Sequence, residues 1–320
     1  FEIKSDKAHK ELQKICTANI KNEVGKCIYT HMLNPDGGIE TDLTVVCIDK
    51  DYFRIISSAA TRERDKFHIK KYLAKDIELK DVTDDFCVFG VFGPKSRALM
   101  KSISKDDFEN DEFRFGTAKY ISIEGIKIWT QRLSYVGELG FELYVTSKDA
   151  KKIYELLIDK GKDFNLSNCG MHAMDIMRME SGFLHWGHDI SPEENQYQAG
   201  LSFTISSKKE DEFIGKKALE KIKKEKIKSR FAMFTLKDSK PGEPLLLHDE
   251  PIYLENNIIG RSTSGNYSFN FKKNLAFGYI NNDISNDELN KKDLFIEVEK
   301  KKYPIDLIIK PLKQTNFKNN

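Results

Sequence analysis

The fold is decided by the stretch Leu133-Ser134-Tyr135-Val136-Gly137-Glu138-Leu139-Gly140-Phe141-Glu142-Leu143-Tyr144-Val145. Successive side chains of a strand point to opposite faces, so Glu142 shares its side with large apolar neighbours. An upstream stretch does the same for Asp42, namely Gly37-Gly38-Ile39-Glu40-Thr41-Asp42-Leu43-Thr44-Val45. A carboxylate among apolar side chains is typical of a small polar site in an apolar pocket. The two stretches therefore predict strands that present a ligand-binding site.

Composition narrows the classes of protein to which the chain can belong. At 320 residues with 39% hydrophobic content, two or three compact units are expected. The 52 Lys and Arg against 50 Asp and Glu leave a net charge of +2, which argues against nucleic acid as a partner. No apolar run approaches the length that spans a bilayer, so we expect a soluble protein without a membrane partner.

The five cysteines are odd in number and lack C-x-x-C spacing. This pattern predicts reduced thiols rather than a disulfide framework or structural zinc. We therefore expect a cytoplasmic protein, or one of the mitochondrial matrix if the organism is eukaryotic. The chain begins at Phe1 within a predicted strand and without an initiator Met, which predicts a fragment of a longer protein. It contains no G-x-G-x-x-G fingerprint, so any dinucleotide-binding unit would lie outside it.

Periodicity predicts that strands and helices alternate in the first two thirds of the chain. Ser5 and Asp6 are expected to cap a first helix, and Asn34-Pro35-Asp36-Gly37-Gly38 to form the turn of a hairpin. Alternation from Lys119 to Leu133 predicts further strands. The other predicted strands are Lys26–Leu33, Ile39–Ile48, Tyr52–Ser57 and Phe86–Phe92. The other predicted helices are Thr61–Ala74, a helix that begins after Gly93-Pro94, Asp149–Gly161 and Met171–Glu180.

The last third reads as short strands at close spacing, which predicts a small β-barrel or a sandwich. We therefore expect an α+β fold with antiparallel sheets. The predicted division is a two-lobed α+β domain over residues 1–226, a C-terminal β-barrel domain over 227–313 and a disordered tail over 314–320. The predicted strands are Arg230–Leu236, Pro251–Glu255, Ile258–Ser262, Leu275–Ile280, Leu294–Val298 and Ile305–Ile309.

Four stretches together resemble the tetrahydrofolate-dependent aminomethyltransferase family. They are the two quoted above, Cys169–Gly182 and His185–Ile190, and the resemblance runs from Phe1 to about Leu312. It is nearest to the C-terminal folate-binding part of dimethylglycine and sarcosine dehydrogenases. The resemblance implies three lobes in a ring, with tetrahydrofolate in a central channel.

In the family, the aspartate of the G-G-I-x-x-D-L motif lies beside the reacting nitrogens of the folate, and this position matches Asp42. The resemblance therefore implies that Asp42 is catalytic. An aminomethyl or iminium donor is cationic, so a nearby carboxylate can take up a proton or stabilise the charge. Glu40, two residues earlier on the same strand face, is the rival candidate, and a solvated strand carboxylate is the structural alternative.

The pterin-binding glutamate of the family ends the Y-x-G-E-x-G-x-E motif and matches Glu142, while the tyrosine matches Tyr135. The resemblance implies that both bind folate. The 2-amino-4-oxo edge of a pterin offers two parallel N–H donors, which one carboxylate can accept as a fork. Glu138 is expected to serve the turn, and Tyr135 could instead be an ordinary core aromatic residue.

Two residues depart from the stand-alone aminomethyltransferases. Met174 replaces an arginine of the helix motif, and Trp186-Gly187 replaces Tyr-Gly. Both substitutions match the dehydrogenase-linked branch, which disfavours a lipoyl-carrying partner and favours a small methylamine-type donor. Arg178 and Glu180 match the family helix. Arg178 is a folate-binding candidate on this basis, although a structural ion pair explains it equally well.

His185 and His188, with Asp189, have a spacing that a metal site could use. The resemblance implies no metal, and we expect none. Trp186 is expected to pack on a folate ring instead.

The stretch Gly260-Arg261-Ser262-Thr263-Ser264-Gly265-Asn266-Tyr267 resembles the third-lobe loop that faces the channel, which makes Tyr267 a folate-binding candidate. A simple hairpin turn is the alternative. The lysines of Lys208–Lys228 could attract a folate polyglutamate tail, although a solvated helix face explains them better.

The resemblance implies one-carbon transfer to tetrahydrofolate, giving 5,10-methylenetetrahydrofolate. FAD would bind only to a region outside this chain, in a separate oxidoreductase domain or partner. A stand-alone aminomethyltransferase or demethylase is the first alternative. A non-catalytic folate-binding module is the second, but its K-G-C-Y-x-G-Q-E segment is replaced here by Phe213-Ile214-Gly215-Lys216-Lys217, without the cysteine.

Overall fold

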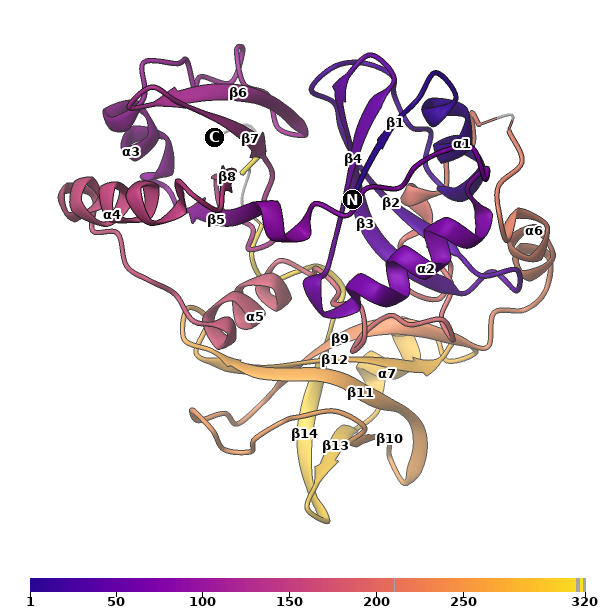
Figure 1. The fold of residues 1–320 in the computed structure, drawn as a ribbon. Coiled ribbons are helices and arrows are strands. Elements are labelled where there is room, and N and C mark those ends of the chain that lie inside the picture. The colour runs from indigo at the N-terminus through magenta and orange to yellow at the C-terminus, as the bar shows by residue number, and fades with distance from the viewer. Residues whose placement is uncertain (210, 315–316, 319–320) are drawn as a thin grey trace.

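The computed structural model describes residues 1–209, 211–314 and 317–318. The described chain forms three lobes, two built on antiparallel sheets and the third on a closed barrel. Figure 1 shows the two sheet lobes side by side above the barrel, with helix α5 (Met171–Glu180) among them. The predicted α+β, three-lobed fold is confirmed. Every helix in the described part of the chain is too short or too polar to cross a membrane.

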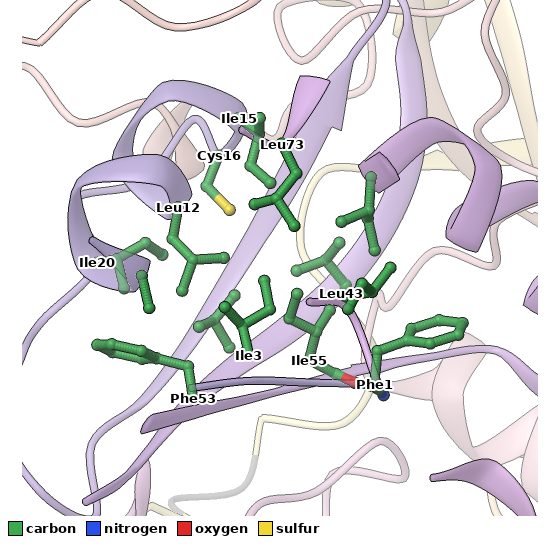
Figure 2. Close-up of a cluster of buried hydrophobic side chains, with 14 of the residues drawn as sticks. Phe1, Ile3, Leu12, Ile15, Cys16, Ile20, Leu43, Phe53, Ile55 and Leu73 are labelled. Carbon is green, nitrogen blue, oxygen red and sulfur yellow. Dashed lines mark hydrogen bonds between the residues drawn. The ribbon is translucent and has the colours of Figure 1, made fainter. Parts of the chain in front are cut away.

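The first lobe is a four-stranded sheet in the order β1-β4-β3-β2, with helices against one face. Its apolar core includes Leu12 and Leu43, 0% and 3% exposed, and Figure 2 shows how their neighbours gather. Burying each leucine stabilises the fold by about 1.5–3 kcal/mol. Its elements are β1 (Glu2–Lys4), α1 (Ala8–Ile15), β2 (Cys27–Leu33), β3 (Ile39–Asp49), β4 (Tyr52–Ser57), η1 (Ala59–Thr61) and α2 (Arg62–Tyr72).

The predicted cap of the first helix is wrong. Helix α1 begins at Ala8, its N-cap is Lys7, and no side chain caps it. The Ser5 hydroxyl instead accepts from the backbone N–H of Lys7, at 3.2 Å, in a turn before the helix. Ser and Asp bond their own local backbone as readily as a helix end, which explains the misassignment.

The second lobe is a four-stranded sheet in the order β5-β8-β7-β6. Apolar residues of β7 and β8 pack under helices on its outer face, including Ile128, Phe141 and Leu143. The elements are η2 (Thr83–Asp85), β5 (Phe86–Phe92), α3 (Ser96–Ile103), β6 (Thr117–Ile123), β7 (Ile126–Arg132), β8 (Gly140–Thr146), α4 (Ala150–Gly161) and η3 (Lys162–Phe164). Because strand residues alternate, the residues between these apolar ones face the first lobe.

The inner faces of the two sheets meet in a small apolar cluster. Val46 of β3 lies there with Trp129 of β7 and Tyr144 of β8. Asp42 is on the same face of β3 as Val46, and Glu142 is on the same face of β8 as Tyr144. Both carboxylates therefore lie on the facing surfaces of the two sheets, beyond the contact that joins them.

A long connection covers the first lobe before the barrel begins. It contains α5, η4 (Ser202–Thr204) and α6 (Lys216–Lys224), the helical part of the predicted lysine-rich segment. Its residues lie against the start of β3, where Ile39 N–H donates to the Glu194 carbonyl at 2.9 Å. Gly38 allows this approach, since a Cβ there would lie 1.8 Å from the Pro192 carbonyl oxygen.

The third lobe is a closed barrel in the order β10-β11-β12-β9-β14-β13, which decides between the two predicted architectures. Helix α7 (Asn286–Lys291) was not predicted, although Ser285 caps it by accepting from Glu288 N–H, as an S-x-x-E pattern indicates. The strands are β9 (Ser229–Leu236), β10 (Pro251–Leu254), β11 (Asn257–Ser268), β12 (Lys273–Asn281), β13 (Leu294–Val298) and β14 (Lys301–Ile308).

The predicted loop Gly260–Tyr267 is wrong, because the whole stretch lies within β11 and pairs with β12. The glycine and serine residues that suggested a loop have other roles. Gly260 allows close packing, since a Cβ there would lie 2.0 Å from the Tyr279 carbonyl oxygen. The strand has a register shift between Ser262 and Ser264. Ser264 bonds to Arg178 and Asp189 of the connection, whereas Ser262 bonds to Glu250 just before β10.

The predicted disordered tail lies partly outside the described residues. Within it, Phe317 is described and makes edge contacts with Phe115 and Phe183, at ring distances of 5.4 and 6.2 Å. Just before the predicted tail, the backbone N–H of Lys313 donates to the Glu180 carbonyl at 2.8 Å. The chain after β14 therefore returns from the barrel to the second lobe and the end of α5.

Candidate functional site

Asp42 lies half-buried on the inner face of β3. Burial raises the pKa of this carboxyl to about 7, with Asp65 adding to the increase and a hydrogen bond with Tyr29 opposing it. A carboxyl with a pKa near 7 is half ionised at neutral pH, so it can both accept and release a proton. This is the protonation behaviour that the candidate catalytic role of Asp42 requires.

Glu142 lies half-buried on β8, where Tyr144 donates its hydroxyl to Oε2 at 2.9 Å. Burial raises the pKa of Glu142, and the Tyr144 hydrogen bond opposes the increase. Glu142 also interacts electrostatically with Cys27 on β2. The carboxylate therefore points from the second lobe toward the first.

The two carboxylates approach neighbouring positions of one strand. Gln131, the residue paired with Glu142, accepts from Cys27 Sγ at 3.9 Å. Asp42 interacts with Tyr29, two residues further along the same face of β2. Two residues of a strand span about 7 Å. A ligand that contacts both acids would thus lie across β2, between the two lobes.

Tyr135 lies in the loop between β7 and β8. Its hydroxyl donates to the Leu184 carbonyl at 3.0 Å, and its ring stacks on Phe183. Burial raises the pKa of Tyr135, with Arg178 opposing the increase and Asp42 adding to it. Tyr135 therefore joins Asp42 and the α5 region in one cluster, and its hydroxyl oxygen can still accept a hydrogen bond.

Arg178 is only 1% exposed, and protein groups surround its guanidinium. It donates to Asp175 at 2.9 Å, to Asp189 at 2.5 Å, to Ser264 at 2.8 Å and to the Phe183 carbonyl at 3.1 Å. Asp189, 0% exposed, also accepts from Thr263 and Ser264. This arrangement is a buried ion pair that joins α5, residues 185–190 and β11.

Trp186 lies against the first lobe. Its Nε1–H donates to the Ile39 carbonyl at 3.0 Å, and the Arg64 guanidinium lies over its ring at 4.4 Å. Arg64 also pairs with Glu40, the rival acid, at 2.5 Å. Glu40 is therefore neutralised by a cation, whereas no cation is paired with Asp42 among the described residues.

Tyr267 is half-buried on β11 and its ring contacts Phe269 at 5.1 Å. Its neighbours Asn266 and Ser268 bond to Asp175 and Glu180 of α5, so alternation directs Tyr267 to the other face of the strand. Among the described residues, no contact joins Tyr267 to Asp42, Glu142 or Tyr135. Its folate contact stays a prediction that the geometry does not favour.

The histidines of the predicted metal alternative lie close together, with ring centroids of His185 and His188 at 4.7 Å. Among the described residues, no three His, Cys, Asp or Glu side chains gather as a metal site requires. Burial, together with Arg178 and His188, lowers the pKa of His185. His185 is thus neutral at pH 7 and unsuited to pair with an anion.

Groups beside Glu142 fit a flat, polar-edged ring such as a pterin. Gln131 pairs with Glu142 across β7 and β8, is 0% exposed, and its Nε2 has no hydrogen-bond partner in the described chain. The ring of Phe92 lies over Gly90 and Gly140, whose missing Cβ atoms would be 2.4 and 1.9 Å away. An acceptor, a spare donor and an apolar wall therefore lie together.

Sequence reasoning missed Tyr29, His31, Gln131 and Phe92. For Tyr29, His31 and Gln131, the sequence does contain a signal: each lies an even number of residues from another polar residue of its strand, so the polar side chains share one face. His31 lies directly opposite Asp42 in the β2–β3 register. Counting residues outward from the turn of the predicted hairpin would have given this pairing of His31 with Asp42.

Two family models match the chain. The GCVT N-terminal domain covers residues 1–209, and the glycine cleavage T-protein C-terminal barrel domain covers residues 230–313. The first match alone spans more than half of the chain. The chain therefore belongs to the glycine cleavage T-protein family, as the resemblance of its motifs predicted.

The relatives include stand-alone and dehydrogenase-linked proteins. An aminomethyltransferase of Alkaliphilus metalliredigens is 31% identical over 99% of this chain and 84% of its own length. The mitochondrial dimethylglycine dehydrogenase of Rattus norvegicus is 32% identical over 98% of this chain. The chain spans only 36% of that dehydrogenase. The aminomethyltransferase T structure from Bartonella henselae shares the fold, with a TM-score of 0.84, 20% identity, and coverage of 98% of this chain and 83% of its own.

Proposed function

We propose that this chain transfers a one-carbon unit to tetrahydrofolate, as the C-terminal part of an FAD-dependent dehydrogenase. The donor would be an iminium derived from a methylamine of the dimethylglycine or sarcosine type. The observation that carries the proposal is the pair of half-buried carboxylates, Asp42 and Glu142, on the facing surfaces of two lobes in this family's fold. The match to about a third of a dimethylglycine dehydrogenase supports the dehydrogenase context. FAD would bind outside this chain.

Glu142 would hold the pterin. Its carboxylate accepts the paired N–H groups of the 2-amino-4-oxo edge, and Gln131 Nε2 is free to donate beside it. Phe92 supplies an apolar wall, and Tyr135 closes the site toward α5. Arg178 acts on this site through its protein partners, because Asp175, Asp189, Ser264 and the Phe183 carbonyl already bond to its guanidinium.

Tetrahydrofolate, when bound, supplies two nitrogens that take up a carbon at the oxidation level of formaldehyde. In the transfer, the methylene carbon would form one C–N bond to each of these two nitrogens. The C=N bond of the donor would break, and the donor amine and one proton would be released. Asp42, with its pKa near 7, accepts that proton and releases it to solvent. In its ionised form it also stabilises the cationic donor before transfer.

A stand-alone aminomethyltransferase is the second candidate. The observation that favours it is the Alkaliphilus relative, 84% of whose length this chain covers. The two candidates differ in the oxidation step, which a stand-alone enzyme would not need. Supplying formaldehyde and tetrahydrofolate to the purified chain tests the transfer without a flavin.

Calorimetric titration with reduced tetrahydrofolate tests the folate site. We expect saturable binding by the parent chain, loss of binding in Glu142→Ala, and unchanged binding in the matched control Glu155→Ala, an exposed acid of α4. Asp42→Asn should bind folate but transfer more slowly, because only the proton acceptor is removed. Unaltered binding by Glu142→Ala would refute the assigned pterin contact.

A further inference from the structure

The turn that carries Tyr135 lies against the segment that follows the barrel. This turn, residues 133–139, joins β7 to β8. Within it, the Ser134 hydroxyl oxygen accepts from the backbone N–H groups of Val136, at 3.4 Å, and Glu138, at 3.2 Å. Serine hydroxyls stabilise turns more weakly than Asn or Asp side chains do. The position of the turn therefore depends on the groups that pack against it.

Lys313, in the segment after β14, contacts this turn through its side chain. Its Nζ pairs with the Glu138 carboxylate and donates to the Val136 carbonyl at 3.3 Å. The Lys313 side chain is 8% exposed, and that of Glu138 is 26% exposed. A lysine is rarely buried to this extent unless its ammonium is paired. The two contacts with the turn therefore account for the burial of Lys313.

The backbone of Lys313 contacts a second element. Its N–H donates to the carbonyl of Glu180, the last residue of α5, at 2.8 Å. The last four carbonyls of a helix have no partner within the helix, so Lys313 satisfies one of them. The turn also approaches this helix end, since a Cβ on Gly137 would lie 2.0 Å from Ser181 Oγ. Lys313 thus joins the turn of the second lobe, the end of α5 and the chain that leaves the third lobe.

Aromatic contacts connect the same segment to Tyr135 by another route. Phe317 contacts Phe183 edge-on, with ring centroids 6.2 Å apart. Phe183 in turn stacks on Tyr135, whose hydroxyl donates to the Leu184 carbonyl at 3.0 Å. The ring and hydroxyl of Tyr135 are therefore held by residues 183–184, whereas Lys313 holds the backbone of the turn that carries it.

We propose that Lys313 is a positioning residue, which holds the 133–139 turn against α5 and thereby fixes Tyr135 for the ligand. Its importance for the ligand rests on the proposed function, whereas its effect on the turn does not require folate. The third lobe would thus contribute to the site, because its chain supplies the residue that holds a turn of the second lobe.

Hydrogen exchange followed by mass spectrometry tests the effect on the turn without folate. Lys313→Met keeps an apolar stem but removes the ammonium, so peptides covering residues 134–139 should exchange about three- to tenfold faster, the equivalent of one hydrogen bond. Peptides covering the β2–β3 hairpin should exchange as in the parent. Lys313→Arg keeps a cation and should stay near the parent. The matched control Lys310→Met, which alters an exposed lysine of the same segment, should do so too.

Calorimetric titration with reduced tetrahydrofolate tests the consequence for the site. Lys313→Met should raise the Kd about three- to tenfold, whereas Lys313→Arg and Lys310→Met should bind like the parent. A parent chain that binds no folate would refute the proposed function, and the exchange of the turn would still decide the role of Lys313.

Three results for a folded Lys313→Met protein would overturn the proposal. They are parental exchange at residues 134–139, equally faster exchange of the β2–β3 hairpin, and a parental Kd despite faster exchange of the turn. If Lys313→Met does not fold, Glu138→Gln removes the same ion pair from the other side. It should speed exchange of the same peptides, and unchanged exchange there would equally overturn the proposal.

Discussion

Replacing Arg178 by Met separates a structural role from a ligand-binding role for this residue. The substitution leaves the Asp189 carboxylate, 0% exposed, without its cation. Removing one partner of a buried ion pair costs about 3–5 kcal/mol, because the remaining charge stays out of water. For a chain of this size, that loss corresponds to a fall in Tm of about 5–10 °C.

The assay is calorimetric melting of the parent, Arg178→Met and the double variant Arg178→Met with Asp189→Asn. The double variant no longer buries an unpaired charge, and the amide oxygen of Asn can still accept from Thr263 and Ser264. It should therefore recover part of the lost Tm. An Arg178→Met protein that melts like the parent, but no longer binds folate, would refute the structural role and support the original folate-binding assignment.

The remaining predictions concern Asp42 and Gly38. The pKa of Asp42 is raised by folding, so its ionisation weakens the folded state as pH rises from about 4 toward the folded value near 7. Asp42→Asn should accordingly melt higher than the parent at pH 8, with the difference shrinking toward pH 5; an equal difference at both pH values would contradict this. Gly38→Ala should lower Tm by several degrees, because its methyl group meets a backbone carbonyl oxygen 1.8 Å away. Gly170→Ala meets open space and loses only the preference for glycine at the N-cap of α5, so it should lower Tm less. Similar melting of both alanine variants would show that the connection adjusts.

Local patterns in the sequence predicted the fold well where one segment determines its own structure. Strands Tyr52–Ser57, Phe86–Phe92 and Leu294–Val298, and helix Met171–Glu180, have the predicted bounds. Each has a clear period and a turn at its ends. The stretch Gly260–Tyr267 failed because its small residues suit a loop locally, and only pairing with β12 makes it a strand.

The two candidate acids could be named from the sequence, but their surroundings could not. Asp42 and Glu142 follow from motif positions, and the structure finds both on facing surfaces of two lobes. The partners of Arg178 could not be predicted, because Ser264 is 86 residues away in the sequence. Nor could the contact of His31 Nδ1 with the Thr204 hydroxyl oxygen, 173 residues away in the sequence.

Because Asp42 and Glu142 belong to different lobes, neither lobe alone can offer the complete site that we propose. A ligand that contacts both acids would have appreciable affinity only for the assembled chain. By mass action, it would stabilise that state by about 2.7 kcal/mol at a concentration 100 times its Kd, and partly assembled forms hardly at all. During refolding, folate would thus bind only after the two lobes have docked correctly. It would stabilise the docked state without helping the lobes to reach it.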